Sequence, residues 1–539
     1  MAVHRSEPGQ LIRSAVATIV LGLALTVSPA AGPVAHAAQP APAAGQQADF
    51  DGDGFDDLAV GAVFEDVGGV LDAGAVNVLY GSAAGLIGGG SQLWTQDSPG
   101  VPGIAEQADH FGAALAAGDF DADGFGDLAI GIQLDRDGGV GGGAVVVLYG
   151  SAAGLTANRV QLWTQDSPGV PEDSEFEDHF GVALAAGDLN DDGAADLAVG
   201  VPGEDLGTIG DAGAVIVLYG VPAAGLAATG AQLWTQDSLG VPGVAELSDG
   251  FGNALATGDV DGDGFADLAV GVSQESVRAV TIAGAVNLLF GSAGGLDGAG
   301  SQVFTQDSPG VPGLAEPFDA LGYSVALGDA DHDGFADLAA GVVVEDVGTV
   351  VDAGAVQVLY GSAAGLTTAG SQLWTQNSPG IPDQAEVDDN LGFSVALGDN
   401  DGDGDADLAA GAIGEPVGNA GAAGAVAVLA GSTAGLTAAG SRLLTQDSPG
   451  VPGAAEIGDR LGFRLAVGDF DGDGLADDAA GAWTEGVGPI AQAGAVNVLY
   501  GSAAGLIGGG SQLFTQDSPG VPGVAESDDL LGGALAADN

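Results

Sequence analysis

One acidic phrase returns along this chain at an almost constant interval. Its first residues are Asp49, Asp119, Asp188, Asp259, Asp329, Asp399 and Asp469, so the successive spacings are 70, 69, 71, 70, 70 and 70 residues. A period of this length is typical of a supersecondary unit that is repeated through the fold. Because the repeat runs through residues 48–539, it constrains the architecture of most of the chain.

Each unit contains four short segments with the character of strands, bounded by Gly, Pro or Asp. In the second unit they are residues 111–119, 127–132, 143–150 and 161–165. The third segment, GAVVVLYG, is apolar at nearly every position, which is typical of a strand that is covered on both faces. Four antiparallel strands at this period predict a β-propeller blade, and a linear solenoid is the alternative.

The two ends of the repeat favour a closed ring. Residues 531–539 (LGGALAADN) align with residues 461–469, so the last unit supplies a first strand without its continuation. The residues from Ala48 onward supply a continuation without its first strand, and Asn539 lies 490 residues, seven periods, after Asp49. The sequence therefore predicts an all-β, seven-bladed β-propeller in which the C-terminal strand completes the N-terminal blade.

The acidic loops follow the pattern D-x-D-x-D-G-x-x-D and predict calcium sites, up to seven in all. Alternate carboxylates in a tight loop converge on one point, and oxygen ligands without His or Cys favour calcium. An EF-hand is excluded, because position 12 of the loop, Val60 in the first copy, is never acidic. Solvated acidic turns without metal are the alternative.

The predicted ligands are the four aspartates of each loop and the main-chain carbonyl of the seventh loop residue. They are Asp49, Asp51, Asp53, Phe55 and Asp57; Asp119, Asp121, Asp123, Phe125 and Asp127; Asp188, Asn190, Asp192, Ala194 and Asp196; Asp259, Asp261, Asp263, Phe265 and Asp267; Asp329, Asp331, Asp333, Phe335 and Asp337; Asp399, Asp401, Asp403, Asp405 and Asp407; and Asp469, Asp471, Asp473, Leu475 and Asp477. Asn190 replaces an aspartate, so the third site is expected to bind more weakly.

Charge excludes several classes of partner. The chain has 74 acidic and 8 basic residues, a formal net charge of −66, and all of its basic residues are arginines. Without a basic surface to neutralise phosphates, binding of nucleic acid or of an anionic membrane is not expected. The sequence has no cysteine, so bound metal rather than disulfides is the expected staple.

The N-terminus has the features of a secretion signal. Arg5 and Arg13 form a basic region before an apolar run at residues 15–27. Ala35-His36-Ala37 fits the small-x-small cleavage rule. We expect residues 1–37 to be a signal peptide that is cleaved after about Ala37, residues 38–47 to be a short linker, and residues 48–539 to be the propeller. The rest of the sequence contains no second apolar run of this kind, so no membrane span is expected.

The phrases FG, GDFDGDG, DLAVGA and GAVxVLYG resemble FG-GAP repeats, such as those of the integrin α-subunit β-propeller. The resemblance covers residues 48–539. It implies calcium in the loops between the first and second strands of a blade. It also implies that partners bind the opposite face, which is built from the connections between strands 2 and 3 and between blades. Integrin propellers carry calcium in only some blades, whereas all seven loops here are intact or nearly so.

Other residues have weaker claims to function. Trp94, Trp163, Trp234 and Trp374 share one repeat position with Phe304, Leu444 and Phe514; packing between blades is the favoured interpretation, and sugar binding the alternative. Asp97 and Asp166 of the TQDSPG phrase are expected to cap turns. His110 and His179 occupy one repeat position in adjacent blades and are not expected to meet, and His332 is the remaining histidine after the signal. Arg136 and Arg278, in corresponding loops, are candidates for recognition.

The sequence shows no clear break in the repeat that would mark a catalytic site. We therefore expect a secreted, calcium-binding module for binding or adhesion, monomeric, with an extracellular protein or glycan as its partner. An extracellular hydrolase of polysaccharide or phosphoester on the same scaffold, or a purely structural surface protein, are the alternatives, because a fold alone does not determine a ligand.

Overall fold

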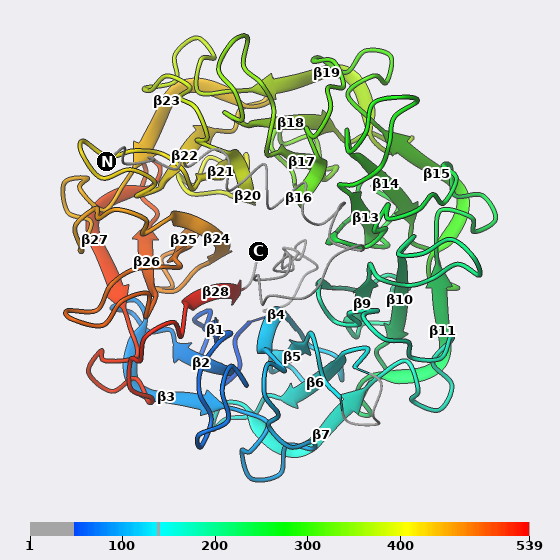
Figure 1. Cartoon of the computed structure of the whole chain (residues 1–539), viewed down its shortest axis with the longest axis vertical. Helices are drawn as coiled ribbons and strands as arrows, with labels where there is room; N and C mark the ends of the chain where they lie inside the picture. Colours follow the sequence, from blue (N-terminus) through cyan, green and yellow to red (C-terminus); the bar gives the residue numbers. More distant parts are fainter. Residues whose placement is uncertain (1–47, 137–140, 538–539) are drawn as a thin grey trace, which may run out of the picture.

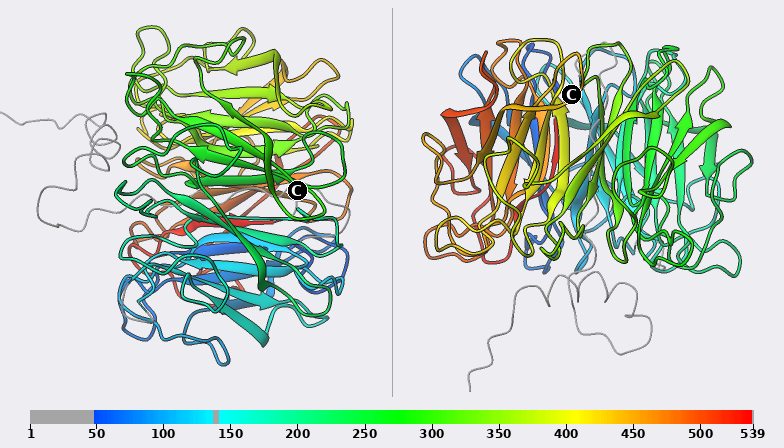
Figure 2. Two further views of the ribbon diagram at one scale, coloured as in Figure 1. Left: turned by 90° about the vertical axis from the view of Figure 1, so that its right-hand side faces the viewer. Right: turned by 90° about the horizontal axis from the view of Figure 1, so that it is seen from above.

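A computed structural model describes residues 48–136 and 141–537 of the chain, and the predicted signal peptide and linker lie outside this part. The described chain forms seven four-stranded sheets that are arranged radially in a ring (Figure 1). Edge-on, the ring is a thick disc with loops on both faces (Figure 2). The prediction of an all-β, seven-bladed propeller is confirmed. No helix in the described part of the chain is long and apolar enough to cross a membrane.

In each blade, the strands are ordered from the axis of the ring to its rim. The innermost strands of blades 1 to 7 are β28 (Leu531–Ala536), β4 (Phe111–Gly118), β8 (Leu184–Gly187), β12 (Ala254–Gly258), β16 (Leu321–Gly328), β20 (Leu391–Gly398) and β24 (Leu461–Gly468). The second strands are β1 (Leu58–Ala62), β5 (Asp127–Ile132), β9 (Asp196–Val201), β13 (Asp267–Val272), β17 (Asp337–Val342), β21 (Asp407–Ala412) and β25 (Asp477–Ala482).

The outer half of each blade consists of a buried third strand and a half-exposed fourth strand. The third strands are β2 (Ala75–Tyr80), β6 (Ala144–Tyr149), β10 (Ala214–Tyr219), β14 (Ala285–Phe290), β18 (Ala355–Tyr360), β22 (Ala425–Ala430) and β26 (Ala495–Tyr500). The fourth strands are β3 (Ile87–Trp94), β7 (Thr156–Trp163), β11 (Ala227–Trp234), β15 (Asp297–Phe304), β19 (Thr367–Trp374), β23 (Thr437–Leu444) and β27 (Ile507–Phe514).

The ring closes as the ends of the repeat predict. Strand β28 pairs antiparallel with β1, and the pairs include Ala59 with Ala536 and Val60 with Leu535. Blade 1 is therefore a four-stranded sheet in the order β28, β1, β2, β3, assembled from both ends of the chain. Closure gives β1 a partner on both sides, so the second strand of every blade in the described ring is paired with two neighbours.

The predicted fourth segment was placed too late in the chain. Residues 161–165 were expected to form it, but β7 spans Thr156–Trp163. Its first half, TANR, lacks an apolar pattern, since the outermost strand is only half-buried. The three inner strands were placed to within about one residue, since their side chains are buried and their sequences are apolar.

Adjacent blades are joined by a repeated set of hydrogen bonds around a tyrosine at the end of the third strand. In blade 1, Tyr80 donates its hydroxyl proton to Gln92 Oε1 at 2.8 Å and accepts the amide of Leu155, in the next blade, at 3.2 Å. Gln92 Nε2 donates to the carbonyl of Leu155 at 3.1 Å. Gly154 has no room for a side chain, because the tyrosine hydroxyl would lie 1.9 Å from a Cβ there. The SAAGL turn thus receives the tyrosine hydroxyl of the neighbouring blade.

The predicted packing role of the aromatic residue on the fourth strand is supported. Trp234 is half-buried against the apolar core between blades 3 and 4, and Phe304 is buried at the same repeat position in blade 4. The TQDSPG aspartates behave as turn caps, since Asp97 Oδ1 accepts the amide of Ala105 at 3.3 Å. Asp166 accepts the amide of Ser174 in the same way, at 3.1 Å.

A second set of contacts joins the blades on the face formed by the connections between blades and by the loops between strands 2 and 3. In six interfaces a buried glutamine after the fourth strand donates its Nε2 proton to a glutamate after the second strand of the next blade, at 2.6–2.8 Å. One example is Gln306 with Glu345. At the interface between blades 1 and 2, Asp135 stands at the glutamate position. These hydrogen bonds keep glutamate carboxyl groups buried at the interfaces between blades.

Burial makes the charged form of these carboxyl groups costly. Burial, with smaller contributions from Glu316 and Asp346, raises the pKa of Glu345 to about 7, although the bond from Gln306 opposes the shift. Burial and the charge of Glu345 raise the pKa of neighbouring Asp319 to about 8. A carboxyl group whose pKa is higher in the folded protein than in the unfolded chain stabilises the fold when it is protonated.

The E345Q variant is therefore expected to be more stable than the wild type at pH 8, by on the order of 2 kcal/mol, and to lose this advantage by about pH 5. The folded protein binds the extra proton below its pKa of about 7, so the wild-type contribution to stability is lost as the pH rises through 7. Melting temperatures measured between pH 5 and 8 in saturating calcium test this. Glu316→Gln, an exposed change on the connection between β15 and β16, removes only a smaller contribution to the pKa of Glu345 and should produce a much flatter difference.

Candidate metal centre

The acidic loops connect the innermost strand of each blade to the second strand, so they gather near the axis on one face of the disc. In the first loop, Asp49 organises the backbone: its Oδ1 accepts the amides of Gly52 and Asp53 at 2.7 and 3.0 Å, and its Oδ2 accepts the amide of Gly54 at 2.8 Å. The same bonds from the fifth and sixth loop residues to the first aspartate recur in the loops that begin at Asp119, Asp188, Asp259, Asp329, Asp399 and Asp469.

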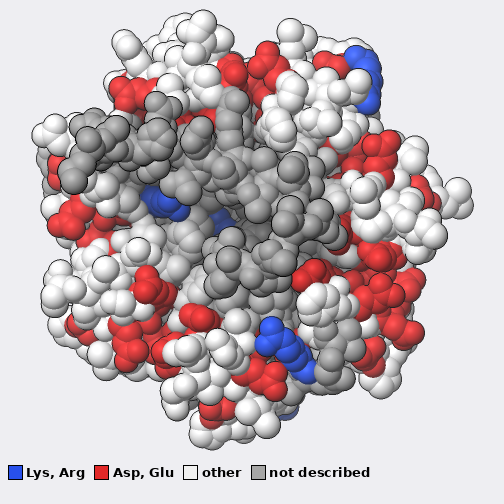
Figure 3. Space-filling model, in the orientation of Figure 1, with Lys and Arg blue, Asp and Glu red and all other residues white. Residues whose placement is uncertain are grey.

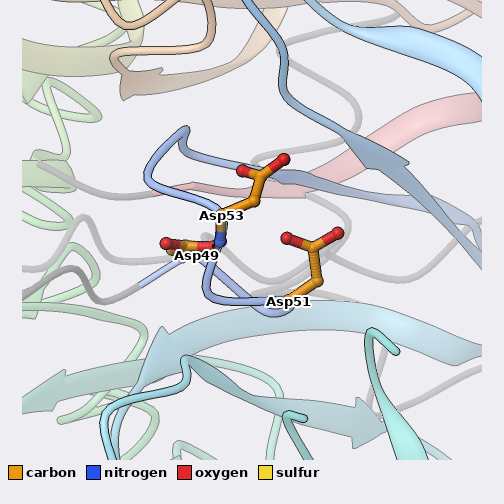
Figure 4. Close-up of side chains that lie close together, drawn as sticks. All are labelled: Asp49, Asp51 and Asp53. Carbon is orange, nitrogen blue, oxygen red and sulfur yellow. Dashed lines mark hydrogen bonds between the residues drawn. The ribbon is translucent and has the colours of Figure 1, made fainter. Parts of the chain in front are cut away.

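The first three aspartates of a loop come together as the sequence predicts. Carboxylate oxygens of Asp49, Asp51 and Asp53 lie within 4.8 Å of one another, and Figure 4 shows the three side chains projecting from one tight turn. The corresponding triplets of blades 4, 5 and 6 are clustered in the same way. In blade 2 the cluster is different and contains Asp119, Asp121 and Asp127.

The fourth aspartate has a structural role that the sequence pattern did not reveal. Asp57 is fully buried; its Oδ2 accepts the amide of Phe50 at 2.8 Å, and its Oδ1 accepts the amide of Gly81, at the end of β2, also at 2.8 Å. Burial raises the pKa of Asp57 to about 9, although both amide bonds oppose the shift. The group thus ties the acidic loop to the third strand, whether or not it also binds metal.

The seventh loop residue packs between blades. A Cβ placed on Gly52 would lie 2.5 Å from the ring of Phe125, so the aromatic side chain of blade 2 lies against the loop of blade 1. Phe335 lies against Gly262 and Phe55 against Gly472 in the same manner. The side chain at this position is therefore explained by packing, and its predicted role as a carbonyl ligand stays a prediction.

The residues present fit a hard divalent cation. Asp51 Oδ1 is buried and has no hydrogen-bond partner among the described residues, and the same is true of Asp331 Oδ1. Burial and the charges of Asp53 and Asp49 raise the pKa of Asp51. A cation with six to eight oxygen ligands would satisfy these oxygens and reduce the repulsion between the carboxylates. In the third loop, the amide of Asn190 donates to both oxygens of Asp196, at 3.2 and 3.0 Å, which supplies part of this stabilisation without metal.

The arginines and histidines singled out in the sequence lie apart from these clusters, with one exception. Arg278 forms an exposed ion pair with Asp307 at 2.7 Å, and Arg136 donates to the carbonyl of Gln107 at 3.1 Å. The imidazole of His110 packs on Phe64 of the preceding blade at 4.7 Å, and burial lowers its pKa to about 4. The exception is His332, an exposed residue within an acidic loop, which bonds to the carbonyl of Gly404 in the next blade at 2.5 Å.

Sequence reasoning missed an aromatic group near the axis of the ring. Tyr323, Phe393 and Phe463, the third residues of β16, β20 and β24, contact one another in sequence, with ring centroids 5.1 and 5.0 Å apart. Trp483, just after β25, stacks on Phe463 at 4.1 Å, and the Arg464 guanidinium lies 4.7 Å from the centroid of that ring. The equivalent residues of the other blades are Ala113, Val182, Asn253 and Gly533. A comparison of this single position through the repeats would have found the group.

Comparison with known families decides the identity of the repeat. The profile of the FG-GAP repeat matches residues 111–148, 180–218, 251–289 and 321–359, which run from the innermost strand into the third strand of blades 2 to 5. The chain contains FG-GAP repeats. The resemblance stated from the sequence is confirmed, and the three blades outside these matches have the same strand order.

Relatives of the FG-GAP chain match over parts of their length. Integrin alpha-PS2 of Drosophila melanogaster is 34% identical over 165 residues, which is 29% of this chain and 11% of the relative. Phosphatidylinositol-glycan-specific phospholipase D of Bos taurus is 32% identical over 158 residues, 29% of this chain and 18% of the relative. Among solved structures, the exotype rhamnogalacturonan lyase YesX matches with a TM-score of 0.35 and 12% identity over 77% of this chain and 66% of that chain. The chain thus spans less than a fifth of the length of the two sequence relatives.

Proposed function

We propose that this FG-GAP propeller is a secreted, calcium-stabilised module, monomeric, that binds an extracellular protein or glycan. The observation that carries the proposal is the ring of acidic loops on one face of the disc, with carboxylate oxygens clustered in successive blades. Similarity to integrin alpha subunits supports a role in binding or adhesion. Secretion is supported by the basic residues, the apolar run and the small-x-small site in residues 1–37.

The face opposite the acidic loops is the proposed partner-binding face. It carries the most variable connections and several exposed apolar side chains, including Leu239, which is 97% exposed, and Leu247 and Leu314, which are 71% and 72% exposed. Arg136 and Arg278 lie in corresponding loops on this face. Figure 3 shows acidic side chains around the whole rim of the face in view and only a few basic patches, so isolated arginines are distinctive points of contact.

Binding to a panel of glycans and matrix proteins, with and without calcium, tests the proposed function. We expect saturable binding of at least one probe, without turnover, that is lost in EDTA because the scaffold loosens. The double variant Arg278→Ala with Leu239→Ser should weaken this binding about tenfold, as contact residues at an interface do. Arg442→Ala, on the outer strand β23, is the matched control and should leave binding unchanged.

Two outcomes would contradict the proposal. Release of product from a polysaccharide or phosphoester in the same panel would favour a hydrolase on this scaffold, the alternative that the phospholipase D relatives support. The absence of binding to every probe, in protein that is shown to be folded and loaded with calcium, would favour a purely structural surface protein.

A further inference from the structure

Blade 2 breaks the repeat at one position of its outermost strand. The fourth residue of this strand is glycine in the six other blades, at Gly90, Gly230, Gly300, Gly370, Gly440 and Gly510, with φ between 83° and 97°. In β7 the residue is Arg159, and its φ is 66°. An arginine is strained in this left-handed conformation, which glycine adopts freely, so a compensating interaction is expected.

Arg159 makes that interaction with the acidic loop of its own blade. Its Nη1 lies 2.5 Å from Asp121 Oδ2, and its guanidinium lies over the ring of Tyr149 at 4.9 Å from the centroid. The side chain of Asp121 is fully buried, whereas the corresponding aspartates of the other loops, for example Asp51 and Asp261, are partly exposed. The long side chain of Arg159 thus brings a fixed positive charge to a predicted calcium ligand.

Two further departures occur at the same loop. Its fourth residue is Ala122, with φ 53°, where the loops of blades 1, 4, 6 and 7 have glycine. Those glycines are contacted by a large side chain of the next blade, such as Phe125 on Gly52, but blade 3 offers only Ala194. Asp121 Oδ1 is buried without a hydrogen-bond partner among the described residues, so a position for a cation is retained beside the arginine.

We propose that Arg159 is a tethered counter-cation that lowers the calcium affinity of blade 2 and keeps its acidic loop ordered when calcium is scarce. This inference rests on the proposed calcium binding. A guanidinium at contact distance from one carboxylate offsets one negative charge of the loop. It also repels a divalent ion that would bind the other oxygen of the same carboxylate. Among loops with all four aspartates, that of blade 2 is therefore the weakest calcium site.

Three variants separate the effect of charge from that of backbone strain. R159Q removes the charge and keeps a polar side chain on the strained backbone, R159G restores the glycine of the other blades, and R159K keeps the charge. Arg442→Gln removes a charge from β23, where the guanidinium donates to the carbonyl of Ala504, and serves as the matched control. Each protein is titrated with calcium by calorimetry, and amide hydrogen exchange of residues 119–127 and 259–267 is followed in EDTA and in calcium.

In R159Q and R159G we expect one site to bind calcium roughly tenfold more tightly while the other sites are unchanged, as expected for removal of one nearby like charge. In EDTA, the wild-type segment 119–127 should exchange more slowly than 259–267, and R159Q should abolish this difference. R159K should resemble the wild type, and R442Q should change neither readout.

Unchanged calcium constants and unchanged exchange in R159Q would overturn the role of Arg159 while leaving the calcium scaffold intact. An effect in R159G but not in R159Q would assign the difference to backbone strain and would also overturn it. If no variant and no wild-type protein binds calcium, the proposed function fails, and the inference fails with it.

Discussion

Removal of calcium is expected to lower the melting temperature of the FG-GAP propeller by about 15 °C or more. A ligand that binds only the folded state at a hundred times its Kd stabilises that state by about 2.7 kcal/mol per site. Up to seven such sites are proposed here, and we expect them to act together, because the loops gather near the axis and are linked through residues such as Phe125. Calorimetric scans in calcium and in EDTA measure the effect, with magnesium as the control ion.

Two substitutions in the first loop separate metal binding from loop architecture. D51N removes one charge from a carboxylate whose Oδ1 is buried without a partner among the described residues. In calcium, it should lower the free energy of unfolding by about 2 kcal/mol. In EDTA, it should leave the free energy of unfolding unchanged or raise it slightly. D49A removes the acceptor of three loop amides and should destabilise the protein in both conditions. An unchanged melting temperature in EDTA, or equal costs for D51N in both conditions, would contradict calcium stabilisation.

The sequence predicted what the repeat imposes on every blade. Strand order, ring closure and the clustering of the first three aspartates follow from spacing and from buried apolar runs such as Ala144–Tyr149. The outermost strand was misplaced, because its first half lies on the half-exposed rim and lacks an apolar pattern. The pattern also did not distinguish Asp57, which ties two segments together, from Asp51, which has a buried oxygen available for a cation.

The residues that depart from the repeat could not be recognised from the sequence of their own blade alone. Arg159 looks like an ordinary surface residue until the three-dimensional alignment places it at a position that elsewhere requires glycine. Tyr323, Phe393 and Phe463 are separated by 70 residues, and only the radial arrangement of the innermost strands makes them neighbours. Contacts between blades depend on the closure of the ring, so local sequence patterns contain little information about them.

Deletion of residues 531–539 is expected to destabilise the whole propeller and not only its last blade. The deletion removes β28, so the second strand of blade 1 becomes an unpaired edge and the buried side chains of Leu531 and Leu535 are lost. Burial of two leucines alone is worth about 3–6 kcal/mol, to which the lost strand pairing is added. The melting temperature should fall by at least about 10 °C, or the protein should aggregate through the exposed edge.

A circular permutant provides the control for this deletion, because it keeps every residue of the strand and changes only its connection. If residues 529–537 are joined directly to Ala48, which reproduces the continuous strand-to-loop connection of the other blades, β28 becomes the covalent first strand of blade 1, and the permutant should melt within a few degrees of the wild type. A synthetic peptide of residues 529–539 added to the truncated chain should restore part of the lost stability by mass action.

A truncated chain that melts like the wild type would mean that the pairing of Val60 with Leu535 contributes nothing to closure. Recovery in the permutant together with loss in the truncation would show that non-covalent pairing of the two chain ends stabilises the entire ring, since each blade is supported only by its two neighbours.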